Sequence, residues 1–182
     1  MGTSAGKEIQ FGVNEKVGAV SGLLLKPETA QALLVLAHGA GAGMRHRFME
    51  QAAVKLAAAG VATLRYQFPY MEKRIKRPDS EAVLIETVRA AMLAAKKNAG
   101  GLPLFAGGKS MGGRMTSLAA SRHPLHDVHG LIFFGFPLHA AGKPGAERGE
   151  HLTGIQIPMF FLQGSRDALA ELKLLKPLCA KV

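Results

Sequence analysis

Ser110 is the residue whose surroundings point most clearly to covalent chemistry. It lies in Gly108-Lys109-Ser110-Met111-Gly112-Gly113, between a short apolar run and a segment with helical periodicity. A Gly-x-Ser-x-Gly pattern between a strand and a helix predicts a sharp turn that lifts the serine hydroxyl clear of the sheet. Such a hydroxyl is a useful nucleophile only when a base takes its proton and N–H groups hold the oxyanion that forms.

Two backbone N–H groups are predicted to form the oxyanion hole. The first belongs to Met111, which begins the helix after Ser110. The second is expected in the loop His38-Gly39-Ala40-Gly41-Ala42-Gly43, which follows the continuous apolar run 33–37. Small residues there allow the backbone to approach a substrate closely, and Ala40 is the predicted donor.

Asp167 is the predicted acid of this site. It ends the loop Gln163-Gly164-Ser165-Arg166-Asp167, directly after the apolar run 157–162. Sites in open parallel sheets lie beyond the carboxyl ends of the strands, which is where this carboxylate falls. A carboxylate in this position orients a histidine and stabilises its protonated form.

At these residues the chain resembles the α/β-hydrolase superfamily. It is similar in particular to a small dienelactone-hydrolase-like family that includes a subunit of the chromatin-associated NSL complex. The resemblance covers nearly the whole chain, and its segments are 38–43, 65–70, 107–113, 136–139 with 142–144, and 163–167. It implies a serine hydrolase of the esterase type, with a small ester or acyl substrate, Ser110 as nucleophile, Asp167 as acid and neither cofactor nor metal.

The chain departs from this family in its histidines. Similar proteins continue past the acid with a helix, a strand and a loop that carries the catalytic histidine, whereas 15 residues follow Asp167 here and none is His. We therefore expect a fold truncated after the acid-bearing strand and a weak or inactive hydrolase. His139 is the best substitute base among the seven histidines, although substrate contact or packing is favoured for it. The alternative is a catalytically inactive scaffold that serves as a binding or interaction protein.

Alternating apolar runs and amphipathic segments predict a single α/β domain over residues 1–182, with a mostly parallel sheet and helices on both faces. The run 157–162 is expected to form an exposed edge, covered by another copy of the chain or by the tail 168–182. The expected strands are 18–26, 33–37, 61–66, 104–106, 128–134 and 157–162, and the expected helices are 48–59, 81–98, 112–122 and 168–176.

The net charge of +10 raises the question of anionic partners. No zinc-finger or aromatic RNA-binding pattern accompanies the basic cluster 72–77, so we expect a solvated surface and no nucleic-acid partner. Four residues are predicted substrate contacts: His38, Arg74, Lys109 and His139. The basic residues Arg74, Arg77 and Lys143 point to an anionic acyl or ester substrate. The single Cys179 and the lack of a signal sequence or an apolar run of membrane-spanning length predict a cytoplasmic protein without membrane association.

Overall fold

A computed structural model describes residues 6–182 and contains a seven-stranded sheet in the order β1-β2-β4-β3-β5-β6-β7. Pairing is parallel from β4 through β3, β5 and β6 to β7. At the other side of the sheet, β1 and β2 form an antiparallel hairpin, and β2 pairs antiparallel with β4. The strands are β1 (Lys7–Asn14), β2 (Gly18–Leu25), β3 (Ala32–Ala37), β4 (Val61–Tyr66), β5 (Leu104–Lys109), β6 (Val128–Phe134) and β7 (Met159–Leu162).

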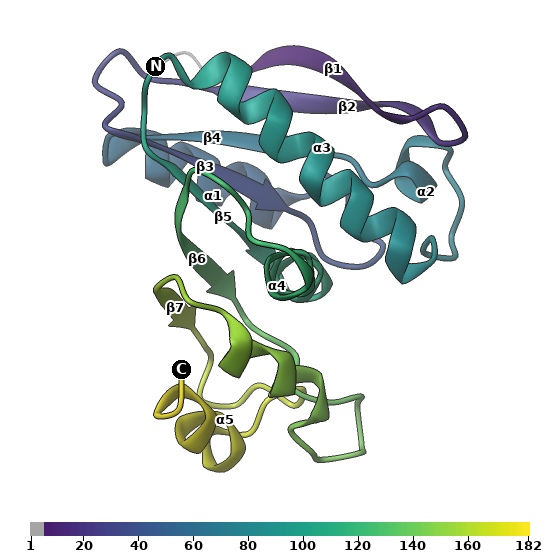
Figure 1. Cartoon of the computed structure of the whole chain (residues 1–182), viewed down its shortest axis with the longest axis vertical. Helices are drawn as coiled ribbons and strands as arrows, with labels where there is room; N and C mark the ends of the chain where they lie inside the picture. The colour runs from purple at the N-terminus through teal and green to yellow at the C-terminus, as the bar shows by residue number, and fades with distance from the viewer. Residues whose placement is uncertain (1–5) are drawn as a thin grey trace.

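Helices cover both faces of this sheet (Figure 1). Helix α1 (Arg47–Ala58) packs on one face, and α3 (Glu81–Ala99) and α4 (Met111–Arg122) pack on the other. The remaining helices are α2 (Pro69–Glu72), the 3₁₀ helix η1 (Glu147–Gly154) and α5 (Leu172–Cys179). The predicted mostly parallel sheet between two helical layers is confirmed.

Strand β3 explains why its sequence is apolar without alternation. Leu34 and Leu36 pack under α1, while Leu33 and Val35 belong to the core beneath α3 and α4. All four side chains are at most 1% exposed. A central parallel strand buried on both faces needs such a run, because side chains alternate between the faces.

Several elements differ from their predicted bounds. Strand β1 and helix α2 were not predicted, since the polar residues of β1 hide its half-buried apolar ones and α2 is only four residues long. Strand β5 continues through two glycines to Lys109, beyond the predicted 104–106. Helix α5 begins four residues later than predicted and includes Pro177, which in a last turn removes a single hydrogen bond.

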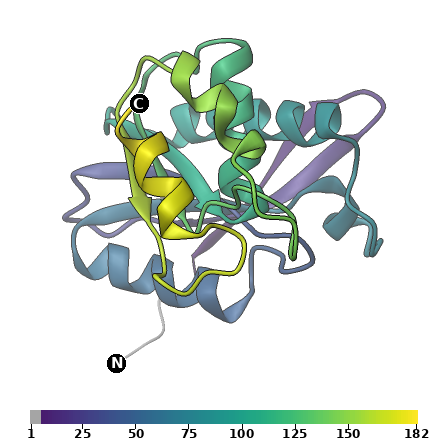
Figure 2. The same cartoon turned by 90° about the horizontal axis from the view of Figure 1, so that it is seen from below.

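Strand β7 forms one edge of the sheet, and its outer side has no strand partner within residues 6–182. Phe160 and Leu162 remain 58% and 45% exposed. Helix α5 lies at this end of the molecule (Figure 2). Its Leu175 and Leu178 are buried in the same core as the residues beneath α3 and α4. Of the two predicted covers, the tail 168–182 adds no strand to this edge. Coverage by a second copy stays a prediction, which light scattering of the purified protein would test.

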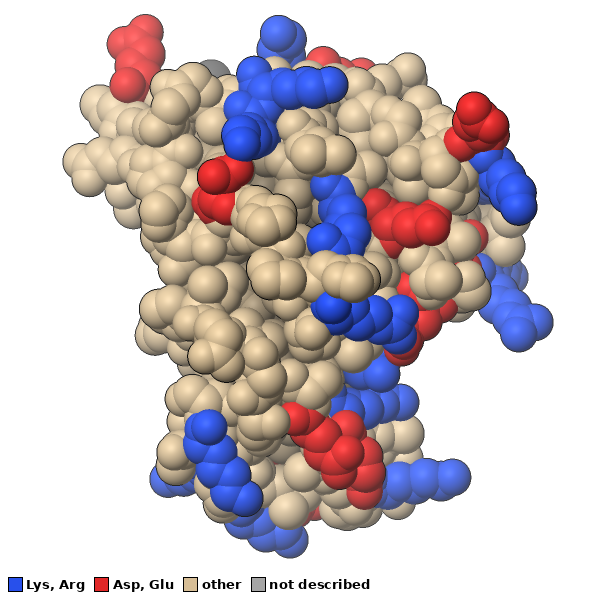
Figure 3. Space-filling model, viewed as in Figure 1, with Lys and Arg blue, Asp and Glu red and all other residues tan. Residues whose placement is uncertain are grey.

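Charged side chains are dispersed over the surface. On the face seen in Figure 3, basic and acidic residues are interspersed. The basic residues of the segment 73–77, which includes Arg74, are exposed. No helix within residues 6–182 is both long and apolar enough to cross a lipid bilayer.

Candidate active site

Ser110 occupies a sharp turn between the last residue of β5 and the first residue of α4. Its backbone angles are φ 51° and ψ −117°, a conformation that L-residues rarely adopt. The Ser110 N–H donates to the carbonyl of Phe134 at the end of the neighbouring strand, at 3.2 Å. Because the Ser110 side chain makes no capping hydrogen bond to α4, its hydroxyl is not committed to the helix.

Two glycines of the motif make this turn sterically feasible. A Cβ atom on Gly112 would lie 2.5 Å from the carbonyl oxygens of both Ala37 and His38. A Cβ atom on Gly108 would lie 2.6 Å from the Ala37 oxygen. Only glycine therefore allows α4 to begin directly against the end of β3, which is the close approach that the sequence pattern predicts.

The loop between β3 and α1 passes beside Ser110. A Cβ atom on Gly39 would lie 3.8 Å from the Ser110 Cβ. The Gly41 N–H in this loop donates to the Tyr70 hydroxyl at 2.9 Å, which fixes the loop from outside. No hydrogen bond of the described residues uses the N–H of Ala40 or of Met111, the first residue of α4. Both N–H groups are thus without a partner among the described residues, and their role as oxyanion donors stays a prediction.

His38 lies beneath this loop and does not face the solvent. It is 0% exposed, its Nδ1 donates to the Gly39 carbonyl at 2.7 Å and its Nε2 accepts from the Phe68 N–H at 3.1 Å. Burial lowers the pKa of His38 from 6.5 to about 4, although the bond to Gly39 opposes this shift. The prediction of a substrate contact at His38 was wrong, because both ring nitrogens hold the backbone in place.

Asp167 lies past the end of β7 and is held by two hydrogen bonds. Its Oδ1 accepts from the Leu169 N–H at 2.9 Å and its Oδ2 accepts from the Gln163 side-chain amide at 2.7 Å. The Gln163 carbonyl oxygen in turn accepts from the Phe136 N–H at 2.7 Å. This amide therefore ties the carboxylate to the chain that follows β6.

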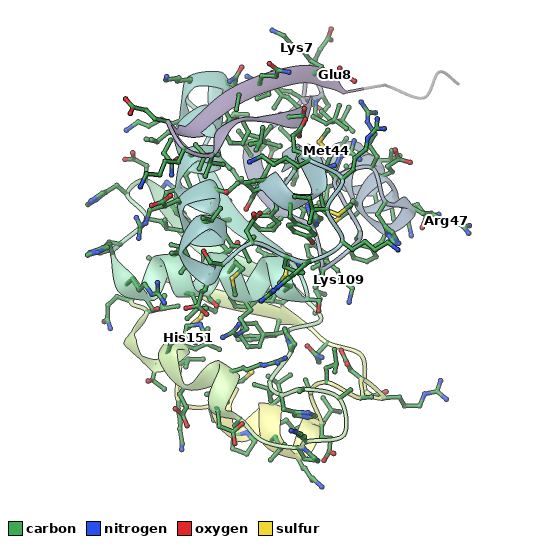
Figure 4. All side chains as sticks on the ribbon, turned by 90° about the vertical axis from the view of Figure 1, so that its right-hand side faces the viewer. Lys7, Glu8, Met44, Arg47, Lys109 and His151 are labelled. Atoms are coloured by element: carbon green, nitrogen blue, oxygen red, sulfur yellow. The ribbon has the colours of Figure 1, made fainter. Side chains whose placement is uncertain are left out.

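A hollow of about 270 Å³ opens beside Ser110. Lys109 lines this hollow. In the side view of Figure 4, Lys109 lies near the middle, with Arg47 toward one side and His151 toward the other. Of the predicted substrate contacts, only Lys109 lines this hollow; Arg74 and His139 do not. The complete lining consists of Gly39, Ala40, Ala42, His46, Phe48, Met49, Lys109 and Ser110.

A family model described as an alpha/beta hydrolase domain matches residues 30–180. The chain belongs to the alpha/beta hydrolase family. This confirms the resemblance to the α/β-hydrolase superfamily and the predicted α/β fold class.

Solved structures of this hydrolase fold resemble the chain over almost its whole length. At identities below 25% this likeness concerns the fold alone. An alpha-beta serine hydrolase homologue from Coxiella burnetii is 18% identical, with 97% of this chain and 82% of that chain covered and a TM-score of 0.77. Est1E from Butyrivibrio proteoclasticus, with ferulic acid bound, is 16% identical over 95% and 85%, with a TM-score of 0.76. Dienelactone hydrolase from Anabaena variabilis is 20% identical over 96% and 93%, with a TM-score of 0.67.

Four histidines of the described residues use ring nitrogens in hydrogen bonds: His38, His46, His139 and His151. No hydrogen bond within residues 6–182 joins a histidine to Ser110 or Asp167. His139 is 3% exposed, bonds the Ala140 carbonyl at 2.9 Å through Nδ1, and has a buried Nε2 without a partner. His151 bonds Ser117 at 2.7 Å within the protein.

Sequence reasoning missed two residues that position the site. Tyr70 holds the loop 38–43, and Gln163 holds Asp167, each through a side-chain hydrogen bond. Both stand inside segments on which the family resemblance rests, so membership of those segments was the available signal.

Proposed function

We propose that the chain is a serine hydrolase of the esterase type that acts on a small ester or acyl substrate at Ser110. The observation that carries this proposal is the backbone of Ser110, held at φ 51° and ψ −117° at the rim of a hollow. Strained residues of this kind cluster at functional sites, where the surrounding structure maintains them. Ala40 also lines this hollow, and neither its N–H nor that of Met111, the residue after Ser110, makes a hydrogen bond among the described residues.

The proposed reaction proceeds through a covalent acyl-enzyme. The Ser110 oxygen attacks the carbonyl carbon of the ester, a base takes the hydroxyl proton, and the carbonyl oxygen becomes an oxyanion bound by the N–H groups of Ala40 and Met111. The C–O bond to the alcohol then breaks and the alcohol leaves with a proton. Water releases the acid from Ser110 by the same steps, so the chemistry uses no cofactor.

Activation of Ser110 sets the expected rate. In a serine protease, removal of the triad histidine lowers kcat by roughly 10⁶, and about 10³- to 10⁴-fold acceleration over water remains from binding and the oxyanion hole. Because no histidine of residues 6–182 bonds Ser110, we expect slow turnover by these residues. Asp167 serves as the acid of the site in this proposal.

A second candidate function is a non-catalytic binding protein built on the same fold. The state of Asp167 favours it, since both carboxylate oxygens already accept hydrogen bonds from Gln163 and Leu169. Under this alternative Ser110 holds a ligand by hydrogen bonding and forms no covalent bond.

Reaction with a fluorophosphonate, detected by intact-mass spectrometry, separates the two functions. A hydrolase site gives one adduct per chain that is lost in Ser110→Ala. The matched control is Ser117→Ala, because Ser117 has a histidine partner at 2.7 Å but is 0% exposed. Labelling that persists in Ser110→Ala, or no labelling of the folded protein, would contradict the hydrolase proposal.

A further inference from the structure

Lys109 is a half-buried cation beside Ser110 that has no acidic partner. Its Nζ lies 5.9 Å from the centre of the Phe48 ring, and no ion pair of the described residues includes it. Asp167 is nearby, since Lys109 Nζ and Asp167 Oδ2 flank Gly135, but its oxygens already accept hydrogen bonds from Gln163 and Leu169. Those hydrogen bonds leave the negative charge of Asp167 in place, so Lys109 has one carboxylate close by but none at ion-pair distance, and its ammonium can still attract an anion.

Gly135 keeps the space that the ammonium occupies. A Cβ atom on Gly135 would lie 2.8 Å from Lys109 Nζ, and the residue adopts φ +70°, which favours glycine. Glycine at position 135, directly after β6, therefore leaves room for the end of the Lys109 side chain.

His46 adds a hydrogen-bond donor to the hollow that Lys109 lines. As the N-cap of α1, it accepts the Phe48 N–H on Nδ1 at 3.2 Å. In the neutral ring the proton must then be on Nε2, which becomes a donor. No Asp or Glu is among the residues that line the hollow. Lys109 and His46 thus both line a hollow that Ser110 also lines.

We propose that this hollow is a subsite for an anionic group of the substrate, with Lys109 as the counter-ion and His46 Nε2–H as a hydrogen-bond donor. The proposal rests on the proposed hydrolase function and names its substrate class. The substrates are esters whose acyl or alcohol part ends in a carboxylate or phosphate, such as monoesters of short dicarboxylic acids. The anionic end places the ester carbonyl at Ser110.

Binding to the Ser110→Ala protein tests this subsite without any need for turnover. Affinities for monomethyl glutarate, neutral dimethyl glutarate and inorganic phosphate are measured by calorimetry or NMR titration at low ionic strength. We expect the monoester to bind about tenfold more tightly than the diester, because a charge-assisted contact is added. Tighter binding of phosphate than of the monoester would assign the subsite to phosphate esters, and the reverse order to carboxylates.

Substitution of Lys109 locates the effect. Lys109→Met keeps the length of the side chain and removes its charge, so it should remove the tenfold preference, while Lys109→Arg should retain most of it. Lys55→Met is the matched control, since Lys55 is an exposed lysine on α1 that does not line the hollow. Equal affinity for monoester and diester, or an unchanged preference in Lys109→Met, overturns the proposal.

These results are separable from those of the labelling experiment. A preference for the monoester in Ser110→Ala without phosphonate labelling of the unsubstituted protein would support the subsite and reject the hydrolase. Labelling at Ser110 without any preference for the anion would reject the subsite alone.

Discussion

Replacement of Ser110 by glycine is expected to stabilise the protein relative to replacement by alanine. At φ 51° and ψ −117° any residue with a Cβ atom is strained, at a cost of about 1 to 3 kcal/mol. Ser110→Ala keeps this strain and, as Ser110 caps no helix N–H, deletes no capping bond. Ser110→Gly relieves the strain but adds unfolded-state entropy, which costs about 0.4 to 1 kcal/mol. The glycine variant should therefore be more stable than the alanine variant by about 1 kcal/mol.

Urea unfolding followed by far-UV circular dichroism measures this difference, since the chain has no tryptophan. A matched pair is Ser121→Gly and Ser121→Ala, within α4 where the backbone is ordinary. There the order should reverse, with glycine less stable by about 1 kcal/mol. If Ser110→Gly proves less stable than Ser110→Ala, the turn does not store strain at residue 110 and the main support for a functional serine is lost.

Three further outcomes follow from hydrogen bonds around the site. The pKa of His38 is about 4 in the folded protein and 6.5 in the unfolded chain, so the unfolded state binds the extra proton. As the pH falls from 6.5 to 4, the free energy of unfolding should fall by roughly 3 kcal/mol more in the unsubstituted protein than in a His38→Gln variant, and equal losses in urea titrations would contradict this. Tyr70→Phe removes the acceptor of the Gly41 N–H, which should cost about 1 kcal/mol and slow phosphonate labelling; unchanged labelling would rule out a role in holding the loop. Gln163→Leu should destabilise the protein by about 1 to 3 kcal/mol, and a double-mutant cycle with Asp167→Asn should show coupling, whereas additive effects would mean that the two side chains act independently.

The sequence predicted the parallel strands and the turn at Ser110 because local chemistry decides both. Four successive buried residues of β3 leave no polar face, and glycine at positions 108 and 112 is required by carbonyl oxygens within 2.6 Å of a Cβ. The residue types and their spacing are therefore enough to predict this strand and this turn. Neither prediction requires knowledge of the tertiary contacts.

The residues that position the site were beyond this reasoning. Gln163 and Tyr70 act on partners that lie 4 and 29 residues away through their side chains, and neither belongs to a motif with its own spacing rule. The role of His38 depends on burial, since an exposed histidine at the start of a Gly-rich loop would face a substrate. Strand β1 was missed because its alternation of apolar and polar residues is weak. Its hydrogen-bonded pairing with β2 stabilises the strand, and strand propensity alone does not predict that pairing.

A comparison of Ser117 in α4 with Ser110 at the N-terminus of this helix shows what reactivity requires in this fold. Ser117 has a neutral imidazole at 2.7 Å, since burial and the nearby Arg114 lower the pKa of His151 to about 4. Yet Ser117 is 0% exposed and its hydroxyl donates to the Arg114 carbonyl at 2.9 Å, so no substrate carbonyl can approach it. Ser110 has no imidazole partner among the described residues but lines a hollow, next to the predicted oxyanion donors Ala40 and Met111. Because attack on a carbonyl requires access and an oxyanion site before a base can help, the backbone at Ser110 determines where acyl transfer is feasible. A base then determines how fast it proceeds.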